Sequence, residues 1–265
     1  MPERRSHPIP ITALRALLLS LCCTLVPQTS AATEPPLNVV CDLWPPYQMV
    51  VDGRLDGFST QVVRRVFERL GVATRETRVY PWKRAIVMLE RGAADALFSA
   101  NYTAERARFS HYPDEPLVET PWVLWAEPSL AATYQGIDEL RARRVGVVRG
   151  YSYTTEFWDF IKRHQVAEEA ESDEQNFRKL QAGRLDFVVA EQGNGQQLVD
   201  RLGLSERVVP ITAHPIKIDG LYLIFSKAHV SPELVARFST ELSRFKREAE
   251  YRRLEHDYLG RDMDD

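Results

Sequence analysis

The sequence has little cysteine and no histidine pattern typical of a metal site. Its 265 residues include 3 cysteines and 6 histidines. Cys22 and Cys23 lie in an apolar run near the amino terminus, so Cys41 is the only cysteine after it, and a disulfide within that later part is excluded. The later histidines lack the short spacings of zinc ligands; they are His111, His164, His214, His229 and His256. We therefore expect no metal and no cofactor.

Motifs of common enzyme classes are also missing. The chain contains no Gly-x-Ser-x-Gly nucleophile turn and no phosphate-binding loop. Gly193-Asn194-Gly195 lacks the third glycine and the ribose-binding acid of a dinucleotide turn, so we discount it. The sequence therefore favours a protein that is not an enzyme.

The first 32 residues have the pattern of a secretory signal peptide. Residues 16–26 form an almost unbroken apolar run, preceded by a positive leader that contains Arg4, Arg5 and Arg15. Small residues lead up to Ala32, and cleavage after it is typical of this pattern. A membrane-spanning helix needs about 20 apolar residues, which argues against an uncleaved anchor. Lipidation is disfavoured because Leu21, which is not small, precedes Cys22. We therefore expect a soluble periplasmic protein.

Charge of one sign is not in large excess. The formal net charge is −3, and removal of residues 1–32 changes it to about −5. No block of basic residues is present. A mildly acidic chain without such a block is a poor candidate for binding nucleic acid or an anionic membrane surface.

From residue 37 the chain alternates patterns typical of strands and helices. Strands are expected at 37–40, 77–80 and 94–100. Between them, apolar residues at helical spacing predict one helix that ends at Gly71 and another that begins at Pro81. A β-α-β-α-β series predicts a parallel sheet that helices cover on both faces.

A second series of the same kind follows. Strands are expected at 144–148, 166–170 and 187–190, with helices at 154–164, around Phe177 and up to Gly203. Two such series predict two lobes. Residues 121–127 and 218–226 are candidates for two strands that cross between them, and a long helix over 232–258 is expected to pack on the first lobe. The predicted boundaries are 1–32 for the signal peptide, 33–122 and 218–265 for the first lobe, and 123–217 for the second.

Polar residues follow the third predicted strand. Ser99, Asn101 and Arg106 lie at its carboxyl end, where open α/β sheets bind ligands. A guanidinium binds a carboxylate through two parallel hydrogen bonds, so Arg106 is a candidate for holding a ligand carboxylate. The alternative is a surface ion pair of Arg106 with Glu105 or Glu115.

Two positions in the second series are further candidates. Glu191 directly follows the strand at 187–190, and its carboxylate can receive a ligand ammonium group. The alternative is an acid that interacts with the dipole of the following helix. Gly150 and Ser152 lie between a strand and a helix start, where backbone N–H groups can bind an anion.

Aromatic residues gather in the turns of the first series. They can enclose an apolar or cationic side chain of a ligand. Each of them, taken alone, is also compatible with a place in the core. They are Trp44, Tyr47, Phe58, Tyr80 and Trp82.

The order of these residues resembles the family 3 extracellular solute-binding proteins, the polar amino-acid receptors of ABC importers. The matching pieces span nearly all of the chain after residue 32. They are Trp44-Pro45-Pro46-Tyr47, Gly57-Phe58, Pro81-Trp82-Lys83-Arg84, Gly92 with Asp95, Thr103-x-x-Arg106 with Ser110 and Tyr112, Val145-Gly146-Val147 through Gly150, Gly183-Arg184-Leu185-Asp186, and Leu221-Tyr222-Leu223.

The resemblance implies an α/β fold of the type II periplasmic-binding-protein clamp. Each lobe would be a mostly parallel sheet flanked by helices, and two crossing strands would form the hinge. It implies a monomer that delivers its ligand to an inner-membrane ABC permease. Arg106, assisted by Asn101, would hold the ligand carboxylate and Glu191 the α-ammonium. The resemblance places Gly150 and Ser152 where the second lobe meets the carboxylate, and Trp44, Tyr47 and Phe58 around the ligand side chain. Ser99 and Tyr80 are further candidates for ligand contact.

The chain departs from the family pattern at two of these positions. Asn101 stands where amino-acid binders usually carry Ser or Thr, and Glu191 where they usually carry Asp. The expected ligand is therefore an amino acid or a related carboxylate. Two alternatives stay open, a dehydratase on the same scaffold with Glu191 as general acid, and a sensory receptor for a membrane signalling partner.

Overall fold

Apart from Met1, the computed structural model describes residues 35–260. The predicted signal peptide, with Cys22 and Cys23, lies outside the described residues, so its cleavage stays a prediction. In the described part of the chain, no helix combines the length and the apolar character that crossing a membrane requires.

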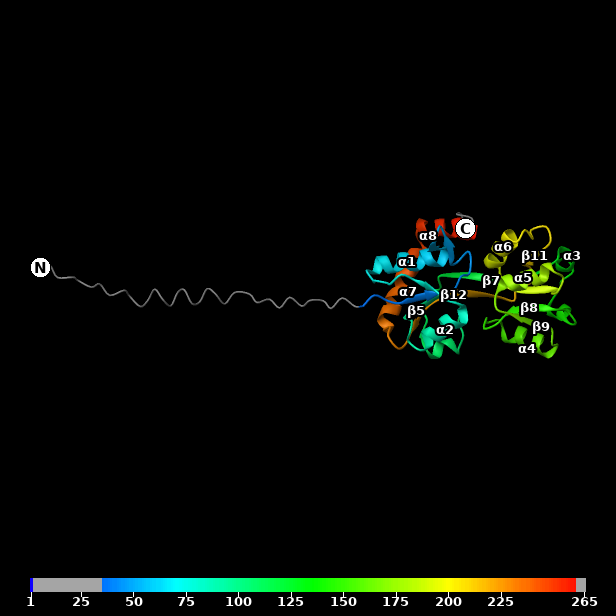
Figure 1. Ribbon diagram of the computed structural model, residues 1–265, viewed down its shortest axis with the longest axis horizontal. Helices are drawn as coiled ribbons and strands as arrows, with labels where there is room; N and C mark the ends of the chain where they lie inside the picture. Colours follow the sequence, from blue (N-terminus) through cyan, green and yellow to red (C-terminus); the bar gives the residue numbers. More distant parts are fainter. Residues whose placement is uncertain (2–34, 261–265) are drawn as a thin grey trace. The chain divides into compact units, whose positions relative to one another are not determined.

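The first lobe is built on three parallel strands, as the sequence predicted. β1 lies between β4 and β5, and Val40 pairs with Arg78 of β4 and Leu97 of β5. The strands are β1 (Val39–Cys41), β4 (Arg78–Val79) and β5 (Ala96–Ala100), and the helices that follow β1 and β4 are α1 (Phe58–Leu70) and α2 (Trp82–Glu90). In Figure 1, α1 and α2 lie on opposite sides of these strands.

Two long strands join the lobes. They are β7 (Val118–Ala126) and β12 (Lys217–Ser226), which pair with each other in antiparallel fashion. β12 also pairs with β5, and β7 pairs with β10 (Phe187–Glu191) of the second lobe, which contains β8 (Val145–Val148) and β9 (Ala167–Ala170) as well. The strands of both lobes therefore share one continuous sheet, whose main path has the order β4-β1-β5-β12-β7-β10-β8-β9, and Figure 1 shows β7 and β12 running between the lobes. The predicted lobe boundaries fall at these strands and stay a prediction.

The second lobe repeats the pattern. β8 lies between β9 and β10, all parallel. Its strands are β8 (Val145–Val148), β9 (Ala167–Ala170), β10 (Phe187–Glu191) and β11 (Val209–Ile211), and its helices are α3 (Pro128–Ala131), α4 (Thr155–Arg163), α5 (Asp173–Gln181) and α6 (Gln192–Arg201). The remaining short elements are 3-10 turns at Arg106–Arg108 and Ile137–Leu140, and strand β6 (Ser110–His111), which pairs with β12.

The helix ends follow local sequence signals. α1 ends at Gly71, whose left-handed backbone (φ 65°) lets its N–H bond to Glu68 and closes the last turn. The side chains of Thr154 and Ser172 accept hydrogen bonds from backbone N–H groups at the starts of α4 and α5. Such caps satisfy donors that the helix itself leaves unpaired.

The expectation of one long final helix is wrong. The segment forms α7 (Pro232–Lys246) and α8 (Ala249–Leu259), separated by Glu248 in an extended conformation. The break lets Tyr251 of α8 pack against Phe245 of α7, with ring centroids 5.7 Å apart. It also places Glu248 against Arg69 of α1, where two 2.8 Å hydrogen bonds join the side chains. Tertiary contacts outweigh helical propensity at this point.

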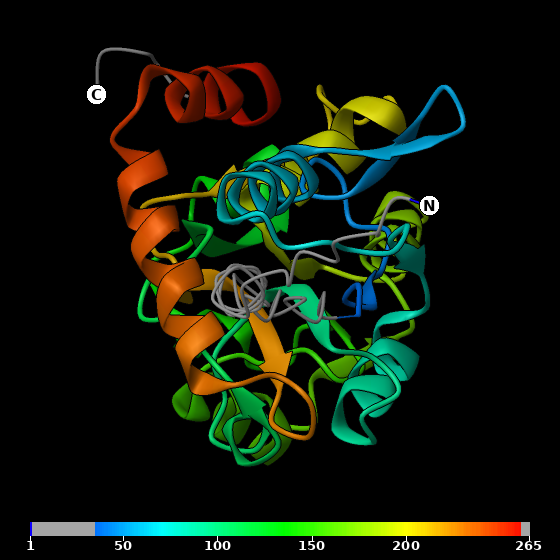
Figure 2. The same cartoon turned by 90° about the vertical axis from the view of Figure 1, so that its left-hand side faces the viewer.

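The hairpin β2 (Met49–Val51) and β3 (Arg54–Asp56) was not predicted. Its two strands pair only with each other, and Figure 2 shows it extending from the body of the first lobe. The turn at Asp52-Gly53 has positive φ at both residues, 50° and 75°. Asp-Gly is typical of such two-residue hairpin turns, so the signal was present in the sequence.

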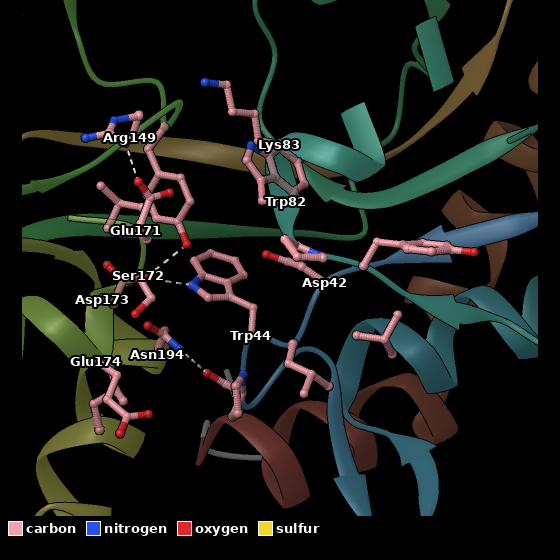
Figure 3. Close-up of a pocket in the computed structure, with 18 of the residues that line it drawn as sticks. Asp42, Trp44, Trp82, Lys83, Arg149, Glu171, Ser172, Asp173, Glu174 and Asn194 are labelled. Atoms are coloured by element: carbon pink, nitrogen blue, oxygen red, sulfur yellow. Dashed lines mark hydrogen bonds and ion pairs between the residues drawn. The ribbon is translucent and has the colours of Figure 1, made fainter. Parts of the chain in front are cut away.

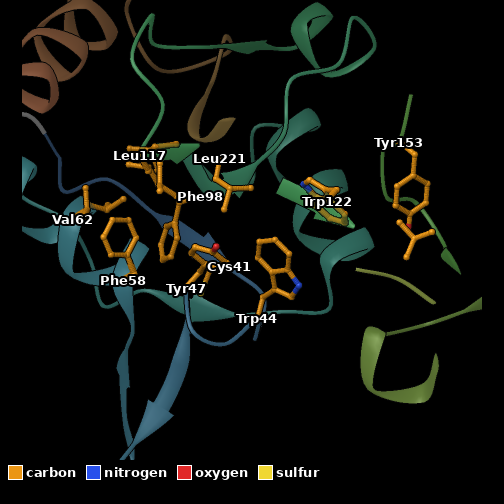
Figure 4. Close-up of a cluster of buried hydrophobic side chains, with 14 of the residues drawn as sticks. Cys41, Trp44, Tyr47, Phe58, Val62, Phe98, Leu117, Trp122, Tyr153 and Leu221 are labelled. Carbon is orange, nitrogen blue, oxygen red and sulfur yellow. The ribbon is translucent and has the colours of Figure 1, made fainter. Parts of the chain in front are cut away.

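A shared hydrophobic core runs from α1 through the crossing strands into the second lobe. Figure 4 shows Phe58, Tyr47 and Phe98 packed beside Trp44 and Cys41. Cys41 is fully buried, and burial raises the pKa of its thiol to about 12. The thiol is therefore a packing group without a charge at neutral pH.

Candidate ligand-binding cleft

Two adjoining hollows lie between the lobes at the carboxyl ends of the strands. The larger hollow has a volume of about 440 Å³ and takes lining residues from both lobes. The smaller one is about 20 Å³, room for roughly one water molecule. The two share the side chains of Asp42, Trp44, Trp82 and Tyr151. Figure 3 shows the larger hollow.

Arg106 lies in the smaller hollow and is buried, with 8% of its surface exposed. Its Nη1 donates to the carbonyl of Asn101 at 2.9 Å, and its Nη2 donates to the carbonyl of Gly150 at 3.2 Å. The guanidinium carbon lies 5.0 Å from the ring centroid of Trp82. Burial lowers the pKa of Arg106, but a guanidinium stays charged in proteins. The alternative of a surface ion pair with Glu105 or Glu115 is not what the structure shows.

Two other predicted residues of the strand end lie in the same small hollow. Asn101 donates from Nδ2 to the carbonyl of Gly220 on β12 at 3.1 Å. The Ser99 hydroxyl lies 2.8 Å from Oε1 of Gln48 and 2.9 Å from the hydroxyl of Ser59. Ser99 has φ 64°, a region that residues other than glycine rarely adopt and that often marks functional sites. The strand end is therefore held in a strained, well-anchored geometry.

Gly150 contributes differently from the expectation. Its carbonyl, rather than an N–H group, faces Arg106. α4 starts only at Thr155, and the N–H of Phe157 in its first turn donates to the Thr154 side chain. Ser152 lines the small hollow, and its hydroxyl has no hydrogen-bond partner among the described residues. The turn therefore brings a carbonyl and a hydroxyl, rather than an N–H nest, to the cleft.

Asp42 is a site residue that the sequence reasoning missed. It directly follows β1 and lines both hollows. Its Oδ1 accepts a 3.0 Å hydrogen bond from Gln48, the residue that also contacts Ser99. Burial raises the pKa of Asp42 to about 6. The rule that selected Arg106, polar residues at the carboxyl end of a parallel strand, applies equally to Asp42.

Trp44 and Asp173 form a contact between the lobes. The Trp44 indole Nε1 donates to Oδ2 of Asp173 at 3.1 Å, and the Tyr151 hydroxyl donates to the same oxygen at 3.0 Å. The Trp44 ring stacks on Tyr47 at 4.9 Å and on Trp122 at 5.8 Å. Figure 3 shows both hydrogen bonds converging on the Asp173 carboxyl. Trp44 thus reaches across the cleft to the second lobe.

Asp173 lies in the first turn of α5 and is 4% exposed. Its pKa is raised to about 7, chiefly by burial and also by the nearby charges of Glu191 and Asp42, while the hydrogen bonds from Trp44 and Tyr151 act in the opposite direction. The sequence Ser172-Asp173-Glu174 has the pattern of an ordinary helix start. Nothing in that pattern indicates that Asp173 faces another lobe.

Glu191 lies apart from the Arg106 group and lines neither hollow. Its side chain caps α6, accepting from the backbone N–H groups of Gly193 at 2.8 Å and Asn194 at 2.7 Å. The Thr120 hydroxyl donates to the same carboxylate. Glu191 is 1% exposed, and burial raises its pKa. The geometry is that of the helix-start alternative in the sequence analysis, with every oxygen engaged inside the protein.

The predicted aromatic residues divide between cleft and core. Trp44 and Tyr80 line the larger hollow. Tyr47 and Phe58 are fully buried and line neither hollow, and their rings meet edge to face at 6.4 Å. Tyr47 in turn stacks on Trp44, and Figure 4 shows Phe58 on the far side of Tyr47 from Trp44. Within residues 35–260 no three His, Cys, Asp or Glu side chains gather as a metal ion would need.

The fold has close counterparts among solved structures. An arginine-, lysine-, histidine-binding protein, ArtJ from Geobacillus stearothermophilus, matches with a TM-score of 0.74 at 16% identity, over 86% of this chain and 96% of that one. A histidine kinase sensor domain with similarity to periplasmic binding proteins matches with 0.72 at 20% identity, over 86% and 97%.

A structure described for glutathione import through GshT and the cystine importer TcyBC of Streptococcus mutans gives a TM-score of 0.73 at 18% identity, over 86% of this chain and 98% of that one. These likenesses show the fold, which is the two-lobe clamp of type II periplasmic binding proteins that the sequence predicted. Comparison with curated proteins returns no match. The family model of the bacterial extracellular solute-binding proteins, family 3, matches residues 37–261, and the chain belongs to that family.

Proposed function

We propose that this protein is a periplasmic receptor that captures a small polar ligand, an α-amino acid or a close relative, between its lobes. The observation that carries the proposal is that a buried guanidinium, Arg106, and a partly buried carboxylate, Asp42, line one hollow. An α-amino acid carries the two complementary charged groups on the same carbon atom. Burial strengthens both interactions because water is excluded from the site.

Arg106 is suited to the carboxylate of the ligand. The two backbone carbonyls that it contacts orient the guanidinium and leave further N–H donors for an anion. Ser152 and Asn101, in the same hollow, supply neutral donors beside it. Binding of a carboxylate would replace the contact of Arg106 with Gly150 and keep the lobes joined through the ligand.

Asp42 is suited to the α-ammonium, the role that the sequence analysis gave to Glu191. The Glu191 carboxylate already accepts two backbone N–H groups and a hydroxyl. The same geometry disfavours the dehydratase alternative, because a general acid must reach the substrate. Capture without chemistry is therefore the simplest function for this cleft.

Lobe closure would present a surface to a membrane partner. We propose that the partner is the permease of an ABC importer and that the receptor acts as a periplasmic monomer, as the family resemblance implies. A sensory role is the second candidate, because the fold is shared with a histidine kinase sensor domain over 86% of the chain.

A thermal-shift screen of residues 33–265 against the L-amino acids, polyamines and small carboxylates tests the proposal. A ligand at about 100 times its Kd stabilises a fold by about 2.7 kcal/mol, which is readily measured. A shift with amino acids that disappears when the α-amine or the α-carboxylate is removed is the expected result. Shifts with amine-free carboxylates alone would contradict the assignment of Asp42.

A further inference from the structure

The two oxygens of Asp173 are in different situations. Oδ2 accepts hydrogen bonds from Trp44 and Tyr151 and so joins the lobes. Oδ1 is buried and has no hydrogen-bond donor among the described residues. A buried carboxylate oxygen without a donor is destabilising. A hydrogen-bond donor from outside the protein, on water or on a ligand, would remove that cost.

Asn194 presents a second buried acceptor in the same hollow. Its Nδ2 donates to the carbonyl of Pro45 at 2.6 Å, which fixes the orientation of the amide because a carbonyl can only accept. Its Oδ1 is left without a donor from the described residues. Asn194 is 2% exposed, and Figure 3 shows its amide near the Asp173 carboxyl on the side of Trp44.

The surrounding charges leave these acceptors without a basic partner from the protein. Of the basic residues that line the larger hollow, Arg149 pairs with Glu169 at 2.9 Å and Arg201 with Glu174 at 2.7 Å. Lys83 points away from Asp173 in Figure 3. Neither Asp42 nor Asp173 forms an ion pair with a described residue, although both line this hollow. The two carboxylates therefore make the larger hollow favourable for a bound cation.

We propose that Asp173 and Asn194 form a second subsite of the cleft, which binds an N–H-bearing cation at the end of the ligand away from its α-carboxylate. The inference rests on the proposed function, since it extends the site around Arg106. The ligand class is an α-amino acid whose side chain ends in a primary ammonium or a guanidinium group. In this arrangement Oδ1 of Asp173 binds the ligand cation, and Oδ2 accepts the hydrogen bond from Trp44. The same carboxylate therefore contacts the ligand and joins the two lobes.

The nature of the two acceptors defines the ligand group. Oδ1 of Asp173 and Oδ1 of Asn194 both need N–H donors, which a quaternary ammonium lacks and a carboxylate side chain cannot supply. An uncharged amide or urea has the donors but not the charge that offsets burial of Asp173. The raised pKa of Asp173, about 7, agrees with a carboxylate that lacks a cation inside the protein.

Isothermal titration of residues 33–265 with L-arginine and L-citrulline tests the proposal. The two have the same length and shape, and only arginine carries the charge. We expect L-arginine to bind about 30-fold or more tightly than L-citrulline. The ratio should grow from pH 5.5 to pH 8, as Asp173 ionises. Citrulline or L-glutamine binding as tightly as arginine, or more tightly, would overturn the inference and leave the proposed function standing.

The Asp173→Asn variant locates the effect. It keeps the acceptor for Trp44 and removes the charge, so the arginine-to-citrulline ratio should fall to about 3-fold or less. Asp200→Asn, which removes a surface carboxylate from α6 of the same lobe, should leave the ratio unchanged. An equal loss for both ligands in Asp173→Asn would show a closure contact only and overturn the inference. If no α-amino acid binds the wild-type protein, the proposed function fails and the subsite with it.

Discussion

The indole nitrogen of Trp44, in the first lobe, donates a 3.1 Å hydrogen bond to Oδ2 of Asp173, in the second. Trp44 belongs to a rigid turn in which its N–H bonds to the carbonyl of Gln48 at 2.8 Å. Asp173 is anchored in the first turn of α5. The bond therefore connects two fixed points, and it forms only when the lobes are together.

Replacement of Trp44 by Phe tests what this bond contributes to closure. Phenylalanine keeps the stacking on Tyr47 and Trp122 but cannot donate to Asp173. Loss of a hydrogen bond to a charged group weakens an interaction by roughly 1.5 kcal/mol, or about tenfold in the Kd for L-arginine. Titration calorimetry measures the Kd for L-arginine, with Trp158→Phe on α4 as the matched control. Equal affinities of the two variants would mean that the bond contributes nothing to capture.

Stability should fall as the pH rises through the range in which Asp173 ionises. Its pKa in the folded protein, about 7, lies above the ordinary value of 3.8, so the folded state binds more protons than the unfolded state between these values. The free energy of unfolding without ligand should therefore decrease between about pH 4 and 7, by on the order of 2–4 kcal/mol.

Urea denaturation at several pH values measures this effect. Asp173→Asn has no proton to bind at this position, so its stability should depend less steeply on pH. The pKa of Asp42 is also raised, to about 6. The free energy of unfolding of Asp173→Asn should therefore still decrease with rising pH, but by less than in the wild type. Parallel pH profiles for the wild type and Asp173→Asn would contradict the assignment.

Replacement of Arg106 by Ala should remove most of the affinity for an amino acid. Truncating one partner of a buried, hydrogen-bonded charge pair weakens binding by roughly 2–5 kcal/mol, which is about 30-fold to several thousand-fold in Kd. Arg106→Lys should recover only part of it, because an ammonium group cannot bind a carboxylate through two parallel bonds. Unchanged affinity in a folded Arg106→Ala protein would remove Arg106 from the site.

Glu191→Ala separates a structural role from a binding role. The substitution removes the cap of α6 and leaves the Thr120 hydroxyl without its acceptor. We expect stability to fall by roughly 1–3 kcal/mol, measured by urea denaturation. The Kd for L-arginine should change by less than about 3-fold at a temperature where the variant is folded. A large loss of affinity without a loss of stability would instead support the ammonium-binding role.

Local patterns were sufficient for most of the fold. The apolar spacing of α1 and its terminal Gly71 predicted that helix because burial of one face and a left-handed cap are local requirements. The polar residues after β5 were recognisable because a strand's carboxyl end is fixed by chain direction alone. By the same reasoning the sequence already contained the signal for Asp42.

Other features depend on contacts between segments far apart in the chain. Glu191 and Asp173 each look like an acid at the start of a helix. Glu191 does cap its helix, whereas Asp173 meets Trp44, 129 positions away. The break between α7 and α8 likewise involves a distant contact, that of Glu248 with Arg69, 179 positions away.

The sequence by itself therefore determined the two α/β lobes, the crossing strands and the position of Arg106 at a strand end, because periodicity and chain direction are local properties. Only the tertiary structure decided that Asp173 faces the cleft and Glu191 does not. The supply of hydrogen-bond donors, rather than burial, distinguishes Asp173 from Glu191, because Glu191 accepts three hydrogen bonds within the protein and Oδ1 of Asp173 accepts none from the described residues. The packing of one lobe against the other sets this difference.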